Sequence, residues 1–121
     1  MLIFKTKIFN RWMQEVGMED ESLVAAVSEI EDGLYDAKLG GCVYKKRVSL
    51  PGKGKRSGMR TILAFKMDEK AIFLYGYAKN KRSTITEKEE KALKTLATIY
   101  FGYSEEQLKQ ALKNLELIEV T

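Results

Sequence analysis

Residues 59–79 read MRTILAFKMDEKAIFLYGYAK, and this stretch decides the fold. Two runs rich in aliphatic and aromatic residues, Met59–Lys66 and Ala71–Lys79, flank the short polar stretch Met67–Lys70. Runs of this length and composition favour strands, and so short a connection joins strands that run antiparallel. The stretch therefore predicts a β-hairpin in the middle of the chain.

A third strand is predicted immediately upstream, at Val43–Leu50. Alternation along a strand puts Lys45 and Arg47 on the face opposite Val48. Pro51 is expected to end this strand, because proline cannot donate a hydrogen bond to a sheet. The glycine- and lysine-rich residues 52–58 are expected to form a flexible loop. Together with the hairpin, the sequence predicts an antiparallel β-meander.

Helical periodicity is found on both sides of the meander. Residues 7–16 and 23–30 carry apolar side chains at i, i+3 and i+4 spacing, with Gly17 and Gly33 as stops, which predicts a helical hairpin. Leu2–Phe4 is expected to be an edge strand, and Tyr35–Gly41 a loop. The fold class follows as α+β, with an N-terminal strand and helical hairpin, the meander and C-terminal helices.

The C-terminal helices begin at polar capping signals. Residues 84–87 and Ser104 precede acidic first turns, and leucines and alanines then recur at helical spacing. Residues 1–121 are therefore expected to form a single domain. The amphipathic stretch 104–121 is expected to be a C-terminal helix with two open roles, which are packing on the domain and binding a partner.

The composition excludes several kinds of site. The chain has no histidine, which removes the commonest general base and metal ligand. Its single cysteine, Cys42, allows no internal disulfide and is read as a small core residue. No metal cluster or nucleotide fingerprint is found, so no metal or cofactor is expected. Without a signal peptide or an apolar run of about 18 residues, we expect a cytoplasmic protein with no membrane partner.

Positive charge is concentrated in the middle of the chain. The net charge is only +4, but residues 45–66 contain eight Lys or Arg and no Asp or Glu, with Lys38 just upstream. Acidic residues gather instead at 15–36 and 87–119. A segment of one sign between mixed flanks is typical of proteins that bind a polyanion.

Two basic segments are expected to meet at one end of the hairpin. In an antiparallel pair the start of one strand lies beside the end of the next, so Arg60 should neighbour Lys79. No acid is expected there to neutralise them. Tyr75 and Tyr77 should point the same way, either as a stacking surface for bases or as core residues. The basic residues of this end are Lys53, Lys55, Arg56, Arg60, Lys79, Lys81 and Arg82.

The sequence resembles the RelE/HigB-like toxins of type II toxin–antitoxin systems over about residues 1–100. Two motifs at this spacing carry the likeness, GKGKRSGMR at residues 52–60 and YAKNKR at residues 77–82. The run DAKLGGCVYKKRV at residues 36–48 and the opening stretch Lys5–Trp12 fit the same family. The resemblance implies a microbial-RNase-type fold and metal-independent cleavage of mRNA on the ribosome. It also implies a cognate antitoxin, often a helix-turn-helix protein, that covers the basic surface.

The resemblance also assigns roles to residues. It implies that Arg60 grips the scissile phosphate, with Lys53, Lys55, Lys79 and Arg82 as further catalytic residues. The founding member has an arginine where this chain has Asn80 and a catalytic tyrosine near Thr86, so the general acid and base are not identified. The expected RNA-binding residues are Lys45, Arg47, Arg56, Tyr75, Tyr77, Asn80 and Lys81.

The expected chemistry needs no histidine. RNA supplies its own nucleophile, the 2′-hydroxyl, and Arg and Lys donors stabilise the charge that develops on the phosphate. A lysine crowded by other cations is the candidate base, which points to Lys53, Lys55 or Lys79. The alternative is a non-enzymatic protein with the toxin fold, such as a gyrase inhibitor or a degenerate member.

Overall fold

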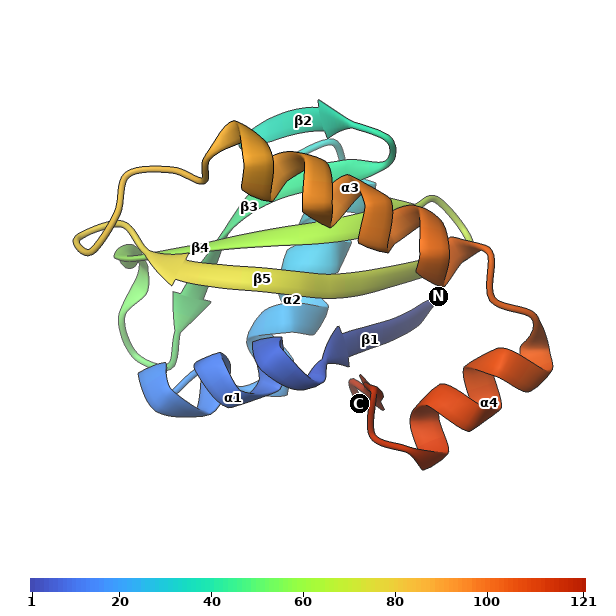
Figure 1. Ribbon diagram of the computed structural model, residues 1–121. Helices are drawn as coiled ribbons and strands as arrows, with labels where there is room; N and C mark the ends of the chain where they lie inside the picture. The colour runs from blue at the N-terminus through green and yellow to red at the C-terminus, as the bar shows by residue number, and fades with distance from the viewer.

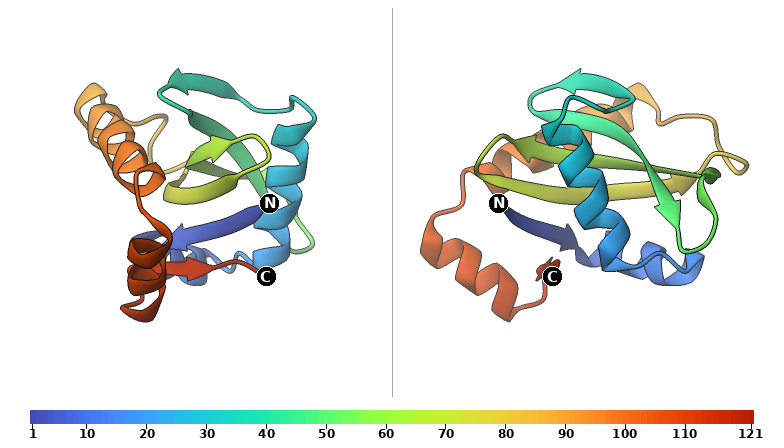
Figure 2. Two further views of the ribbon diagram at one scale, coloured as in Figure 1. Left: turned by 90° about the vertical axis from the view of Figure 1, so that its right-hand side faces the viewer. Right: turned by 180° about the vertical axis from the view of Figure 1, so that it is seen from behind.

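The computed structural model describes the backbone of residues 1–121 and the side chains of all but residues 54, 55 and 57. In the described chain, six strands form one mixed sheet in the order β2-β3-β4-β5-β1-β6, and helices cover both faces (Figures 1 and 2). The predicted α+β fold is confirmed. The elements are β1 (Leu2–Thr6), α1 (Lys7–Val16), α2 (Asp20–Glu31), β2 (Ala37–Gly40), β3 (Val43–Leu50), β4 (Gly54–Lys66), β5 (Lys70–Ala78), α3 (Glu87–Phe101), α4 (Glu105–Lys113) and β6 (Leu117–Glu119).

The central meander matches the predicted strands. β3 pairs antiparallel with β4, and β4 pairs antiparallel with β5. β4 begins at Gly54 rather than at the predicted Met59, so much of the expected loop 52–58 belongs to a strand. The strand was not predicted to begin this early, because the segment is rich in glycine, which has a low preference for strands.

Three predictions about the outer strands are wrong. β1 is not at an edge, because it pairs parallel with β5 and antiparallel with β6. β2 lies where a loop was predicted, and β6 lies within residues 104–121, where a helix was predicted. Both are only three or four residues long, so neither shows the alternation that identifies a strand from sequence.

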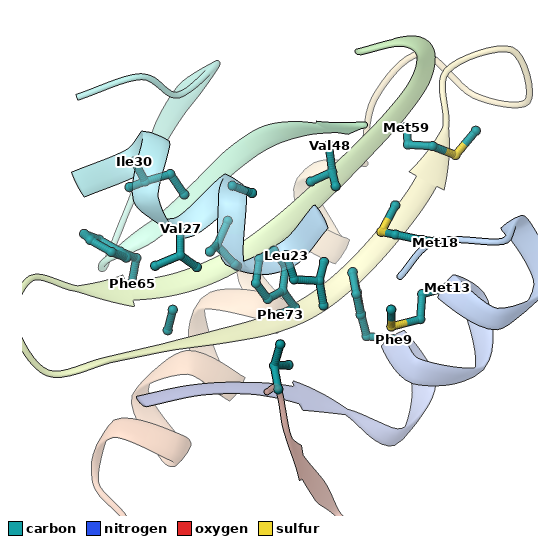
Figure 3. Packing of buried hydrophobic residues seen from close by; sticks show 14 of the residues in the cluster. Phe9, Met13, Met18, Leu23, Val27, Ile30, Val48, Met59, Phe65 and Phe73 are labelled. Carbon is teal, nitrogen blue, oxygen red and sulfur yellow. The ribbon is translucent and has the colours of Figure 1, made fainter. Parts of the chain in front are cut away.

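Helices α1 and α2 cover one face of the sheet. The side chain of Thr6 caps the start of α1 by accepting from the backbone N–H of Phe9, and Gly17 ends it with a φ of 76°. The predicted apolar face of α2 is buried against β3, β4 and β5 (Figure 3). Its members are Leu23, Ala26, Val27 and Ile30.

Helices α3 and α4 lie on the opposite face, as the left view of Figure 2 shows. Each begins with a reciprocal capping box, Thr86 with Glu89 and Ser104 with Gln107. Ala97 and Tyr100 of α3 pack in a second core that also contains Ala111 and Leu117. Residues 104–121 thus pack on the domain, and none of the described helices is long and apolar enough to cross a membrane.

Candidate nucleic-acid interface

One row of side chains crosses three strands on the face that α3 partly covers. The register pairs Arg47 of β3 with Arg60 of β4, and Arg60 with Tyr77 of β5. Cross-strand partners project from the same face of a sheet, so these three side chains are neighbours. Tyr77 belongs to the core beneath α3, which identifies the face.

Arg60 and Lys79 are diagonal neighbours rather than direct partners. The residue opposite Arg60 is Tyr77, while the N–H of Lys79 donates to the carbonyl of Gly58 at 2.9 Å. The prediction that Arg60 directly faces Lys79 is therefore wrong by two residues. Lys79 lies just past the end of β5, and a Cβ added to Gly58 would be 3.8 Å from the Cβ of Lys79, so Lys79 stays beside the strand that carries Arg60.

Two polar atoms in this row are buried without a partner. The Nη1 of Arg60 and the hydroxyl of Tyr77 are covered and have no hydrogen-bond partner among the described residues. The Arg60 side chain is 13% exposed, and Tyr77 is 4% exposed. Buried polar groups without a partner are rare in folded proteins and often mark functional sites or unseen ligands.

The basic surface contains two acids, so the prediction of an acid-free hairpin end is wrong. One carboxylate oxygen of Asp36 lies 3.5 Å from Nε of Arg47 and 3.6 Å from Nε of Arg60. Glu89, from the first turn of α3, binds Arg82. Both acids lie outside the basic run in the sequence and reach it only because β2 and α3 fold beside it.

Arg82 is held by a network of local bonds. Its Nε donates to the carbonyl of Thr84 at 3.0 Å, and its Nη1 donates to the hydroxyl of Tyr75 at 3.2 Å and to Glu89 at 2.9 Å. Its Nη2 donates to the other carboxylate oxygen of Glu89. A guanidinium has five N–H donors, so these four bonds leave one donor for a ligand.

The ion pair changes the titration of both partners. Hydrogen bonds from Arg82 lower the pKa of Glu89 to about 2, and bonds from the backbone and side chain of Thr86 help. The carboxylate in turn raises the pKa of Arg82 above its ordinary value. Arg82 and Glu89 therefore carry opposite charges at every pH at which the protein would work, and they largely neutralise each other.

The two tyrosines lie side by side, as strand alternation predicted. Their ring centres are 6.3 Å apart, and the guanidinium carbon of Arg82 lies 5.9 Å from the ring of Tyr75 and 5.8 Å from that of Tyr77. Tyr77 is a core residue, whereas Tyr75 is half-buried. Together with Trp12, Glu15 and neighbouring residues, they line a hollow of about 340 Å³.

Several predicted residues lie at the rim of this region. Lys45 lies 3.4 Å from the hydroxyl of Thr84, between β3 and the segment after β5. The side chain of Arg47 is 51% exposed, and the side chain of Lys55 lies outside the described part of the structure. The other predicted residues are exposed in or beside the turns that follow β3 and β5. They are Lys53, Arg56, Lys79, Asn80 and Lys81.

Not all of the cations at residues 45–66 lie beside the row formed by Arg47, Arg60 and Tyr77. Lys46 is 3% exposed and pairs with Glu29 of α2 at 2.7 Å, on the other face of the sheet. Lys66 lies at the far end of β4, with its ammonium 5.3 Å from the ring centre of Phe101. The number of Lys and Arg residues between positions 45 and 66 is therefore larger than the number of cations that one ligand can reach.

Thr86 caps α3, in line with the capping signal predicted at residues 84–87, whereas Cys42 does not lie where it was expected. The hydroxyl of Thr86 accepts from the N–H of Glu89 and caps α3. Cys42 is exposed, with a φ of 63°, so the expectation of a core cysteine is wrong. No group of three or more His, Cys, Asp or Glu that would suit a metal ion occurs among the described residues.

A family model described as "RelE toxin of RelE / RelB toxin-antitoxin system" matches residues 1–120. A search of curated proteins found no match. The matched span includes the whole sheet and all four helices in the described part of the chain.

Proposed function

The chain belongs to the RelE family of toxins from toxin–antitoxin systems, and from this premise we propose that it is an endoribonuclease that cuts mRNA on the ribosome without a metal ion. The observation that carries the proposal is the pair of buried donors on Arg60 and Tyr77. A buried polar group without a partner costs about 1–3 kcal/mol. A phosphate oxygen of bound RNA would supply the missing acceptor.

Arg60 is the residue best placed to hold the scissile phosphate. Its only described partner is Asp36, whose oxygen lies 3.6 Å from Nε, so its Nη1 donors are available. Its side chain is largely enclosed by the fold, which fixes the guanidinium before RNA arrives. Preorganised donors of this kind stabilise the charge that develops on a phosphate in the transition state.

The proposed reaction is an internal transfer at phosphorus. The 2′-oxygen forms a bond to phosphorus while the bond to the 5′-oxygen of the next nucleotide breaks. The 2′-hydroxyl gives its proton to a base, and the departing 5′-oxygen takes up a proton. The products are a 2′,3′-cyclic phosphate and a 5′-hydroxyl. Lys79, Lys53 and Lys55 are the proposed bases, and the ribosome positions the mRNA.

Arg82 takes a different role in this proposal from the one that the family resemblance suggested. Four of its donors already bind Thr84, Tyr75 and Glu89. We therefore assign it to positioning the segment after β5, and not to gripping phosphate. Lys45, Arg47, Arg56 and Lys81 supply positive charge around the site, where they attract the RNA backbone.

Membership of the family implies an antitoxin partner. We propose that this partner is a helix-turn-helix protein that covers the surface around Arg60 and prevents RNA from reaching it. The proposed place of action is the cytoplasm, where ribosomes and mRNA are found. Antitoxin binding and RNA cleavage would then compete for the same cations.

The test replaces Arg60 by alanine. Removing one preorganised donor to a transition state lowers rates by about 10²–10³-fold, so Arg60→Ala should abolish growth arrest on expression. Arg11→Ala is the matched control, because Arg11 is an exposed arginine on α1 away from the row. Full toxicity of Arg60→Ala, with folding and expression unchanged, would refute the assignment.

A second function is favoured by the environment of two residues. Thr86 is occupied as a helix cap, and Asn80 stands where the founding member has an arginine. Both fit a toxin that blocks its target without chemistry, such as a gyrase inhibitor. Primer extension on cellular mRNA separates the two functions. Cuts within codons support the ribonuclease, and growth arrest with DNA damage and intact mRNA supports the inhibitor.

A further inference from the structure

Trp12 is held in one position by the strand beside it. The indole lies directly against Gly76 of β5, where an added Cβ would be 2.2 Å from Cζ3 of Trp12. The indole also contacts Phe9, with ring centres 5.4 Å apart. The only residue that leaves room for the indole at position 76 is glycine. Trp12 is half-buried and still contributes to the wall of the 340 Å³ hollow.

The other walls of this hollow are equally fixed. Tyr75 and Tyr77 come from β5, and Arg82 lies against both rings while Glu89 holds its guanidinium. Because Glu89 neutralises Arg82, the guanidinium offers a flat surface more than a net charge. Aromatic rings and guanidinium planes are the surfaces on which unpaired RNA bases stack.

Two charged side chains of opposite sign also line the hollow. Glu15, at the end of α1, is exposed and supplies carboxylate oxygens that only accept hydrogen bonds. Lys81, from the turn after β5, supplies an ammonium that only donates. A ligand that suits both must present donors on one part of its edge and acceptors on another.

We propose that this hollow binds a nucleobase of the RNA, and that the base is guanine. Guanine presents N1–H and N2–H side by side, which match the two oxygens of Glu15, and its O6 and N7 accept from Lys81. Adenine lacks a donor at N1, and uracil and cytosine each lack the paired donors. The inference rests on the proposed function, since it names a base of the RNA substrate, but Glu15 and Lys81, which select the base, lie outside the row that contains Arg60.

The sequence offers a direct reporter for the test. Trp12 is the only tryptophan, so the indole N–H gives a single resonance in a ¹H–¹⁵N correlation spectrum. The whole protein is titrated with GMP, AMP, CMP and UMP, and with inorganic phosphate. We expect GMP to shift the indole resonance saturably and to bind roughly tenfold more tightly than UMP, because of its paired donors. Phosphate alone should leave the resonance in place.

Two variants make the assignment specific. Glu15→Gln should weaken GMP binding roughly tenfold and leave UMP binding unchanged, since the amide keeps one acceptor oxygen and places a donor where the second acceptor was. Glu31→Gln, an exposed acid at the end of α2, is the matched control and should change neither. Equal affinity for all four nucleotides, or a GMP affinity that Glu15→Gln does not alter, would overturn the inference.

Cleavage by the same preparation is measured in parallel, so that the two proposals can fail separately. A protein that cuts ribosome-bound mRNA but shows no nucleotide-dependent shift overturns the guanine site alone. A protein that binds GMP as described and cuts no mRNA overturns the ribonuclease and leaves the base site standing.

Discussion

At the scale of single residues, the hydroxyl of Tyr77 lowers the stability of the fold and lies in the candidate site. Its side chain is 4% exposed, and its hydroxyl has no hydrogen-bond partner in the described part of the chain. Leaving such a group unpaired costs free energy that the folded protein would regain if the oxygen were absent. The hydroxyl is therefore better explained by a ligand than by the fold.

Tyr77→Phe should stabilise the folded protein and weaken its action on RNA. We expect the free energy of unfolding to rise by about 1 kcal/mol, because the unpaired hydroxyl is removed without changing the ring. Urea denaturation measures this, and toxicity on expression gives the functional readout. Tyr75→Phe is the control, because that hydroxyl accepts a bond from Arg82 and its loss should not stabilise. A less stable Tyr77→Phe protein would contradict the account.

Some of these residues could be predicted from sequence, for a physical reason. Strand alternation put Arg60, Tyr75 and Tyr77 on one face, because the side-chain repeat of a strand is local. Asp36 and Glu89 could not be found in this way, since they lie 24 and 7 residues from Arg60 and Arg82 and meet them only through tertiary packing. The net charge of a surface depends on which helices and strands fold beside it.

At the scale of secondary structure, periodicity predicted the long elements and missed the short ones. α1 begins and ends where the apolar spacing and Gly17 indicated, and β3 has its predicted bounds. β2 and β6 depend on pairing with β3 and β1, so their short sequences contain no independent signal. For the same reason β1 was placed at an edge, because the strand that covers it was not foreseen.

The start of α3 makes a prediction about pH. The pKa of Glu89 is about 2 in the folded protein, below its ordinary value of 4.5, so its charge favours the folded state. This stabilisation is complete above about pH 4.5 and is lost as the pH falls toward 2. Glu89→Gln keeps an acceptor for the capping box but removes the charge. The variant should therefore lose less stability than the wild type on acidification.

Urea denaturation between pH 7 and pH 3 measures this difference. Glu87→Gln is the matched control, because Glu87 lies in the same first turn and is exposed. Its acid dependence should follow that of the wild type. If Glu89→Gln and Glu87→Gln respond to pH identically, the ion pair with Arg82 does not stabilise the start of α3.

At the scale of the whole molecule, the C-terminal segment joins the two cores. Leu117 of β6 is 1% exposed and packs in the core beneath α3 and α4, while Val120 packs in the core beneath α1 and α2. β6 also pairs with β1 and so covers a strand that would otherwise form the edge of the sheet. The last residues are therefore part of the folded domain.

Leu117→Ala should destabilise the protein by about 2–5 kcal/mol, the range for removing a fully buried leucine side chain. Thermal or urea denaturation checks the value. The control is Leu115→Ala, because Leu115 is 61% exposed just before β6 and should change stability little. Equal effects of the two substitutions would mean that the C-terminal strand adds nothing to the fold.

The central claim is that this fold uses Arg60 to drive attack by the 2′-hydroxyl on ribosome-bound mRNA. Its most direct test is primer extension on purified ribosomes programmed with an mRNA that carries one 2′-deoxynucleotide at the cleavage position. The wild-type protein should cut the all-ribose mRNA, leaving a 2′,3′-cyclic phosphate, and should fail to cut the deoxy-substituted one. Arg60→Ala should cut neither. Cleavage of the deoxy-substituted mRNA at that position, or undiminished cleavage by Arg60→Ala, would contradict the account.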